Sequence, residues 1–233
     1  MTIGVLDAPD ARILMEVPAD PKLAKFRLNA CAKEPWTTAW IGRMRPGSTL
    51  LDVGACVGSY ALLAAARGLR VLALEPGAEN FQMLCRNVAL NHLERAVIPL
   101  QVALGHENHV TTISYSDPKA GAASHKIDSA VGENPFSWVM QSTMDDLWMH
   151  FGLPVPQYVL IDVDGGEMAV LRGARTVLSH PQCQEMMIEV PNESEEAVKN
   201  EITTCGFKLT ERHDKRNNQP IGPLAYLLFA RDG

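Results

Sequence analysis

The fold of this chain is decided by the stretch Leu51-Asp52-Val53-Gly54-Ala55-Cys56-Val57-Gly58. The apolar run that ends at Val53 predicts a strand, and the Ala- and Leu-rich run after Gly58 predicts a helix that stops at Gly68. The glycines between them allow a sharp turn and a close approach of the backbone to a ligand. We therefore predict a strand, a glycine turn and a helix that together form a ligand site.

The residues around this turn indicate which ligand binds. A nicotinamide dehydrogenase carries G-x-G-x-x-G after its first strand, whereas this chain has Gly54-x-x-x-Gly58, preceded by Asp52. A carboxylate is poorly suited to a pyrophosphate but suits the cationic sulfonium and ammonium of S-adenosylmethionine. Glu75 ends the next strand, 17 residues after Gly58, where doubly wound folds bind ribose hydroxyls. A tight turn without a ligand is the alternative, and the spacing of Glu75 argues against it.

We predict that S-adenosylmethionine is the cofactor and that residues at several strand ends hold it. The glycine turn and the two acids bind its charged and ribose parts, and Gln101 to Ala103 lie near its adenine. The predicted cofactor-binding residues are Asp52, Gly54, Ala55, Gly58, Tyr60, Glu75, Pro76, Gln101, Val102, Ala103 and Asp162.

Strand-like and helix-like runs alternate along the rest of the chain. This alternation indicates a parallel sheet with helices on both faces. The last two strands are joined by a polar turn without a helix, which indicates an antiparallel final strand. We predict an α/β, Rossmann-like fold with a seven-stranded, mostly parallel sheet, built from residues 49–53, 70–74, 96–104, 158–163, 185–190, 208–212 and 224–230.

Two regions interrupt or precede this pattern. Residues 1–48 are rich in proline, and we expect an N-terminal extension that is mostly irregular, with a helix or two, and part of the substrate site. The domain itself covers residues 49–233, with residues 105–147 inserted. Within the insertion we predict a hairpin of Val110–Tyr115 with Trp138–Ser142. We predict that residues 116–137 form a mobile lid or substrate loop.

An ordered set of motifs resembles one known family. The set comprises Asp52-Val53-Gly54-Ala55, Glu75-Pro76, Asn80-Phe81, Leu84, Asn87, Thr143-Met144-Asp145-Asp146-Leu147, Ile161-Asp162-Val163-Asp164-Gly165-Gly166-Glu167, Leu171-Arg172-Gly173-Ala174 and Ile188-Glu189-Val190. In this order, over about residues 48 to 190, the chain resembles the FkbM-type branch of class I S-adenosylmethionine-dependent methyltransferases. The family usually has Asn at Cys56, Lys at Leu160 and Glu at Asp164. The resemblance implies O-methylation of a hydroxyl, typically on a sugar or polyketide.

Three acids are the predicted catalytic residues: Asp162, Asp164 and Glu189. Methyl transfer to a hydroxyl needs a positioned acceptor and a group that takes its proton. Asp162 interrupts an apolar run at the end of its strand, and Asp164 points to the same side if that strand continues. Asp164 could instead cap the next helix, with Glu167 completing a capping box. An acidic cluster could also hold a divalent cation, but nothing in the spacing requires one and we predict no metal.

The charge, the hydropathy and the cysteine content of the chain argue against some classes of partner. The net charge is −6 and the basic residues look scattered, which argues against a nucleic-acid partner. No segment is apolar enough to span a bilayer, and the opening residues lack a secretion leader, so we expect a cytoplasmic protein without a membrane partner. The five cysteines form no C-x-x-C pair and predict buried thiols. A homo-oligomer stays open.

We therefore expect an enzyme that methylates a small-molecule acceptor such as a sugar, a polyketide or a related metabolite. An N-methyltransferase acting on an amine is one alternative, with Asp162 orienting the amine instead of accepting a proton. A non-catalytic regulator that binds the cofactor is another, and the intact Asp52, Glu75 and Asp162 argue against it. The regions that choose the acceptor, residues 1–48 and 105–142, carry no recognisable code.

Overall fold

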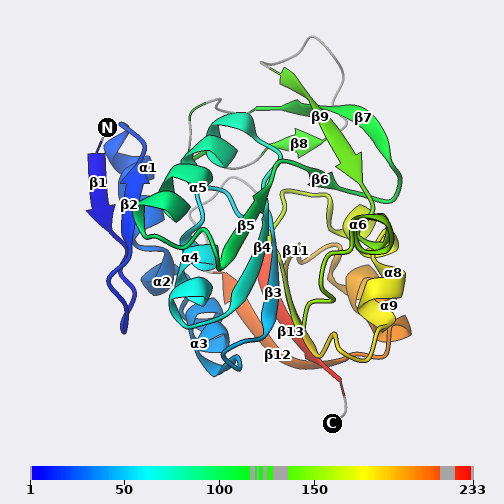
Figure 1. Ribbon diagram of the computed structural model, residues 1–233. Coiled ribbons are helices and arrows are strands. Elements are labelled where there is room, and N and C mark those ends of the chain that lie inside the picture. Colours follow the sequence, from blue (N-terminus) through cyan, green and yellow to red (C-terminus); the bar gives the residue numbers. More distant parts are fainter. Residues whose placement is uncertain are drawn as a thin grey trace.

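The computed structural model describes residues 2–115, 119, 121–122, 125–127, 136–215 and 224–231. A seven-stranded sheet crosses the middle of the molecule in the order β12-β13-β11-β10-β3-β4-β5 (Figure 1). The neighbours from β11 to β5 pair in parallel, and β13 pairs antiparallel with both β11 and β12. The strands are β3 (Thr49–Val53), β4 (Arg70–Leu74), β5 (Val97–Leu100), β10 (Tyr158–Ile161), β11 (Glu185–Pro191), β12 (Lys208–Lys215) and β13 (Leu224–Ala230). The predicted fold class is confirmed.

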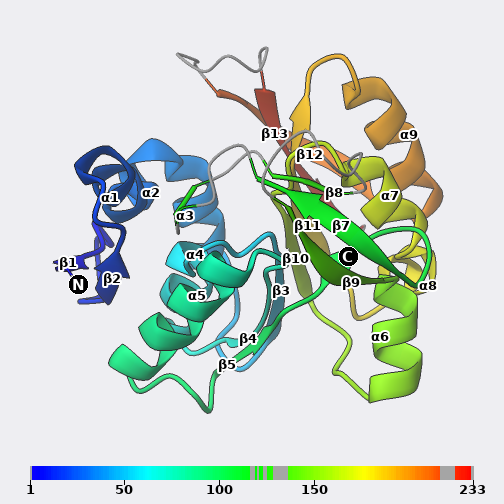
Figure 2. The ribbon, with the colours of Figure 1, turned by 90° about the horizontal axis from the view of Figure 1, so that it is seen from above.

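Helices cover both faces of this sheet, as Figure 2 shows. Consecutive residues of β3 point to opposite faces, so Leu50 enters one hydrophobic core and Leu51 the other. One face carries α3 (Pro35–Arg43), α4 (Ser59–Ala66) and α5 (Ala78–Leu90). The other carries α6 (Met144–Phe151), α7 (Glu167–Arg172), α8 (Arg175–Ser179) and α9 (Glu195–Thr204).

The N-terminal segment is more ordered than the sequence predicted. It contains an antiparallel pair, β1 (Thr2–Val5) and β2 (Leu14–Val17), followed by α1 (Pro21–Leu28), α2 (Ala30–Lys33) and α3. The expectation of a mostly irregular extension was wrong because Pro21 and Pro35 stand in the first turns of α1 and α3. A proline is well tolerated there, since the first helical N–H groups have no partner within the helix.

A second sheet of four strands in the order β6-β9-β7-β8 forms the insertion. It contains β6 (Ala103–Leu104), β7 (His109–Ser114), β8 (Lys126–Ile127) and β9 (Phe136–Ser142). The predicted hairpin is confirmed, since β7 and β9 pair antiparallel. The predicted strand over residues 96–104 is split, because β5 ends at Leu100 and β6 joins the second sheet instead. Most of the predicted lid, residues 116–137, lies outside the described residues.

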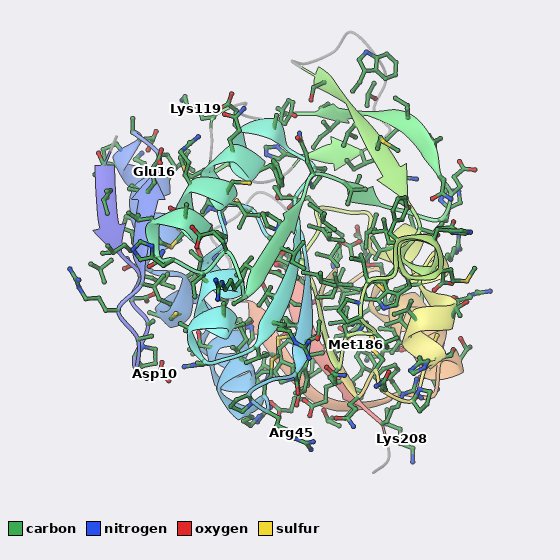
Figure 3. The ribbon with its side chains drawn as sticks, viewed as in Figure 1. Asp10, Glu16, Arg45, Lys119, Met186 and Lys208 are labelled. Carbon is green, nitrogen blue, oxygen red and sulfur yellow. The ribbon has the colours of Figure 1, made fainter. Side chains whose placement is uncertain are left out.

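Asn87 on α5 joins the N-terminal segment to the glycine turn. Its Oδ1 accepts the Glu16 N–H at 2.6 Å, and its Nδ2 donates to the carbonyls of Val57 (2.9 Å) and Glu16 (3.3 Å). Asn87 is fully buried, so its removal leaves three backbone groups without these partners. Figure 3 labels Glu16 beside α5.

We expect Asn87→Ala to lower the free energy of unfolding by roughly 2–4 kcal/mol, because buried polar groups without partners are costly. Urea unfolding measures the change. The control is Glu94→Ala, an exposed position in the turn after α5, which we expect to change stability by less than about 0.5 kcal/mol. Equal stabilities of the two variants would show that Asn87 does not join these segments.

Candidate active site

A cavity of about 600 Å³ lies where β3, β4, β10 and β11 end. This is the carboxyl edge of the parallel strands, where open α/β sheets bind their ligands. Walls come from the strand ends, from α1 and α2, and from the inserted sheet. Its volume is within the range of small-molecule and cofactor sites. Among the predicted site residues, the cavity is lined by Gly54, Glu75, Pro76, Val102, Ala103, Asp162, Asp164 and Glu189.

The glycine turn packs directly against the end of β10. Gly54 has a φ of +86°, and a Cβ built there would lie 2.0 Å from the carbonyl oxygen of Asp162. The N–H groups of Gly54 and Ala55 both donate to the carbonyl of Leu74, at 2.9 and 3.0 Å. Only glycine meets both the left-handed conformation and this contact. The turn therefore places the ends of β3, β4 and β10 around one space.

Glu75 connects the first two strand ends. Its Oε2 accepts the Cys56 N–H at 2.9 Å and its Oε1 accepts the Gly77 N–H at 2.7 Å. Burial raises the pKa of Glu75 to about 7, although these amides and Arg27 favour the charged form. A carboxylate held in this way still has lone pairs for a ligand hydroxyl. Glu75 is therefore fixed in place at the cavity wall.

Asp52 lies beneath the cavity and does not line it. It is buried, and its Oδ2 has no hydrogen-bond partner within the part of the chain that the structure describes. Burial, with the charges of Asp162 and Glu75, raises the pKa of Asp52 to about 7. Four other predicted residues also lie outside the lining, namely Ala55, Gly58, Tyr60 and Gln101. Their part in cofactor binding stays a prediction.

Two of the three predicted catalytic acids meet at one tyrosine. The Tyr226 hydroxyl donates to Glu189 Oε2 at 2.6 Å and lies 3.4 Å from Asp162 Oδ2. Tyr226 stands opposite Glu189 in the pairing of β13 with β11. Burial, with the charges of Asp162, Glu34 and Glu189, raises the pKa of Tyr226 well above its usual value, so the phenol keeps its proton. The phenol therefore donates its one proton to Glu189, the nearer carboxylate, and lies beside Asp162.

Asp164 lines the same cavity as Asp162, but not through a continued strand. The strand ends at Ile161, so the alternation that would align Asp164 with Asp162 does not continue. The capping interpretation is also wrong, because the N-cap of α7 is Gly166 and Glu167 Oε1 accepts the N–H of Gly165 at 2.9 Å. Asp164 is exposed at the cavity edge.

The N-terminal segment contributes a further acid near the site. Glu34 is fully buried, and its Oε2 accepts the Tyr60 hydroxyl at 2.5 Å. Its Oε1 lies 2.9 Å from Lys33 Nζ. Burial and the Glu34 charge raise the pKa of Tyr60. Tyr60, which the sequence assigned to the cofactor, thus bonds to the N-terminal segment instead of facing the cavity.

Sequence reasoning missed several residues of this site. Asn80 of α5 accepts the Gly121 N–H at 2.7 Å and donates to the Ala122 carbonyl at 3.2 Å, and so fixes part of the insertion over the cavity. Arg27 and Lys33 line the cavity from α1 and α2. Tyr226 lies in an apolar strand whose register only the sheet pairing reveals. Of these four, only Asn80 had a signal in the sequence, as part of a family motif.

Comparison with known proteins identifies the family. The description Methyltransferase FkbM domain matches residues 52–209, most of the chain. The chain belongs to this family of S-adenosylmethionine-dependent methyltransferases, as its motifs predicted. The hexuronic acid methyltransferase AglP of Haloferax volcanii is 30% identical over 129 residues, which are 55% of this chain and 51% of AglP. The chain thus spans about half the length of this curated relative.

Solved structures agree on the fold. A putative transferase of Pyrococcus horikoshii superposes with a TM-score of 0.54 at 14% identity, covering 100% of this chain and 72% of that one. The magnesium protoporphyrin IX methyltransferase of Synechocystis PCC 6803, solved with bound S-adenosylmethionine, gives 0.52 at 13% identity, covering 86% and 78%. Among the described residues, no helix has the length and apolar character to cross a membrane.

The residues at the cavity fit S-adenosylmethionine. Gly54 and Glu75 both line the cavity, and two backbone N–H groups hold the Glu75 carboxylate in place. Asp52, Glu75 and Asp162 place negative charge around one region, which a cationic sulfonium compensates.

We expect Glu75→Ala to weaken S-adenosylmethionine binding roughly 5- to 150-fold, because a buried ribose hydroxyl left without its acceptor costs about 1–3 kcal/mol. Isothermal titration calorimetry measures the affinity. Glu79→Ala, an exposed acid in the first turn of α5, serves as the control and should bind normally. Unchanged affinity of Glu75→Ala would remove Glu75 from the cofactor site.

We expect Asp52→Asn to stabilise the unliganded protein at alkaline pH. The pKa of Asp52 rises from 3.8 to about 7 on folding, so the folded state holds the proton more tightly than the unfolded state. The destabilisation therefore appears as the pH rises above about 4 and is complete above about 7. Urea unfolding should show the variant more stable by roughly 2–4 kcal/mol at about pH 8 and no more stable at about pH 4. The same difference at both values would contradict this account.

Proposed function

We propose that this chain transfers a methyl group from S-adenosylmethionine to a hydroxyl of a sugar or a sugar-containing metabolite. The relative AglP is named a hexuronic acid methyltransferase, which supports a carbohydrate acceptor. The cavity opens between the strand ends, the N-terminal helices and the inserted sheet. These last two elements supply the acceptor side.

In this proposal the strand ends hold the cofactor. Gly54 allows the backbone to approach it, Glu75 accepts hydrogen bonds from its ribose, and Val102 and Ala103 pack near its adenine. When bound, S-adenosylmethionine supplies an electrophilic methyl group on its sulfonium. The remaining work of the protein is to position the acceptor and to manage one proton.

Asp162 orients the acceptor hydroxyl and receives its proton. Its backbone N–H donates to the Val53 carbonyl at 2.9 Å, which fixes the residue beside the glycine turn. Tyr226 bonds closely to Glu189 and is 3.4 Å from Asp162. Because a phenol has one proton to donate, Glu189 takes it and Asp162 serves as the acceptor for the substrate hydroxyl. A carboxylate in this position supplies general base catalysis.

The observation that carries the proposal is Asp162 in the cavity lining, at the end of β10 and against Gly54. We expect Asp162→Asn to lower turnover of a sugar acceptor by roughly 10²–10⁴-fold while cofactor affinity stays nearly intact. Steady-state kinetics and calorimetry give the two values. Asp164→Asn, two residues further on the exposed loop, should lose less activity.

Other outcomes assign the chemistry differently. A smaller loss in Asp162→Asn that shrinks as pH rises indicates an amine acceptor, because an amine can lose its proton to water. Full activity toward the true acceptor would exclude Asp162 as the base. Glu189 and His125, which both line the cavity, would then be the candidates for the base.

A further inference from the structure

The helices α1 and α2 carry a concentration of positive charge beside the cavity. Residues 21–33 contain four basic side chains and no acidic one, in a chain whose net charge is −6. Along the whole sequence the basic residues look scattered. The fold brings these to one edge of the active site, because Arg27 and Lys33 line the main cavity. We call Lys22, Lys25, Arg27 and Lys33 the basic patch.

A second hollow of about 320 Å³ adjoins this patch. Lys22, Lys25 and Asn29 form part of its wall, and Phe26 and Lys33 belong to both this hollow and the main cavity. The Lys33 Nζ lies 3.8 Å from the centre of the Phe26 ring. A molecule that reaches the end of β10 can therefore extend over Phe26 into the hollow without leaving the protein surface.

Arg27 acts on one acid of the main cavity, since its charge favours the ionised form of Glu75. Glu34 pairs with Lys33, and Asp20 caps α1 by accepting the N–H groups of Lys22 and Leu23. No carboxylate of the described residues lies within 4.0 Å of a side-chain nitrogen of Lys22, Lys25 or Arg27. Clustered charge of one sign beside a cleft attracts ligands of the opposite sign.

We propose that the basic patch is a subsite for an anionic group of the acceptor, a carboxylate or a phosphate carried outside the reacting hydroxyl. This rests on the proposed function, since the acceptor hydroxyl enters the main cavity. The wall of the hollow is largely apolar, with Phe26 among its residues, and it supports the apolar face of the connecting part. The exposed Lys22 and Lys25 at its rim bind the anion. Asp162 at the end of β10 accepts the proton, and the basic patch selects the substrate by its charge.

Charge reversal of the two exposed lysines tests the subsite. We choose Lys22→Glu with Lys25→Glu, and Lys22→Gln with Lys25→Gln as a milder pair that removes charge without reversing it. The control combines Arg45→Glu and Arg95→Glu, exposed positions that precede β3 and β5. They lie at the amino end of the sheet, whereas the cavity lies at the carboxyl end, and Figure 3 labels Arg45. Unfolding curves confirm that all variants are folded.

Three acceptors are offered to the enzyme together with S-adenosylmethionine: methyl glucoside, glucuronic acid and glucose 1-phosphate. For the anionic sugar that is methylated best, we expect the Glu pair to raise KM about tenfold with kcat nearly unchanged, and the Gln pair to raise it less. Added salt should raise KM of the unmodified enzyme and have less effect on the variants. KM for methyl glucoside and the affinity for S-adenosylmethionine should not change.

The two anionic sugars separate the sources of charge. A KM effect confined to glucuronic acid assigns a carboxylate subsite, and one confined to glucose 1-phosphate assigns a phosphate subsite. Equal KM values for variants and control with both anionic sugars overturn the inference.

Failure of the proposed function gives a different pattern. In that case the enzyme binds S-adenosylmethionine but methylates none of the three sugars. Calorimetry of the two anionic sugars, with S-adenosylhomocysteine added, then decides the inference separately. Binding that the Glu pair abolishes and the control retains supports the subsite, and binding that all variants retain, or no binding to the unmodified enzyme, overturns it.

Discussion

The contact between Gly54 and the carbonyl oxygen of Asp162 is the constraint on which the site depends. A Cβ at residue 54 would lie 2.0 Å from that oxygen, far inside any allowed contact. The glycine therefore lets β3 and β10 end side by side, and the same turn donates two N–H groups to the end of β4. Three strand ends thus meet, and with them Glu75 and Asp162, which both line the cavity. A larger side chain at residue 54 would push the end of β3 away from Asp162.

This arrangement concentrates negative charge in a buried place. Asp52 and Glu75 are both buried, and burial raises each pKa to about 7. Like charges in a low-dielectric site repel one another, so these carboxylates lower the stability of the folded protein. A cationic ligand reduces this repulsion, and the reduction contributes to its binding free energy. The orphan Oδ2 of Asp52 among the described residues is consistent with this view.

Much of the fold could be predicted because it follows from local pattern. Buried runs such as 49–53 and 70–74 form strands where the sequence placed them, and glycine spacing marked the turn between β3 and α4. The N-terminal segment could not be predicted in this way, since β2 is fixed by side chains of α5 that lie about seventy residues away. Tyr226 was equally hidden, because its partnership with Glu189 depends on the register of β13 against β11. The strand predicted over residues 158–163 ends earlier, at Ile161, although Asp164 still lines the cavity.

The cavity wall that we propose for the acceptor is built by elements outside the central sheet. The strand ends of the central sheet supply Gly54, Glu75 and Asp162, the residues that we propose for the cofactor and the base. Selectivity needs walls opposite these groups, and the chain provides them from α1, α2 and the inserted sheet. Asn80 fixes the insertion by two hydrogen bonds, and Arg27 bonds to the Gly121 carbonyl at 2.8 Å. Both walls are therefore anchored to one another, so a change in either alters the shape of the cavity between them.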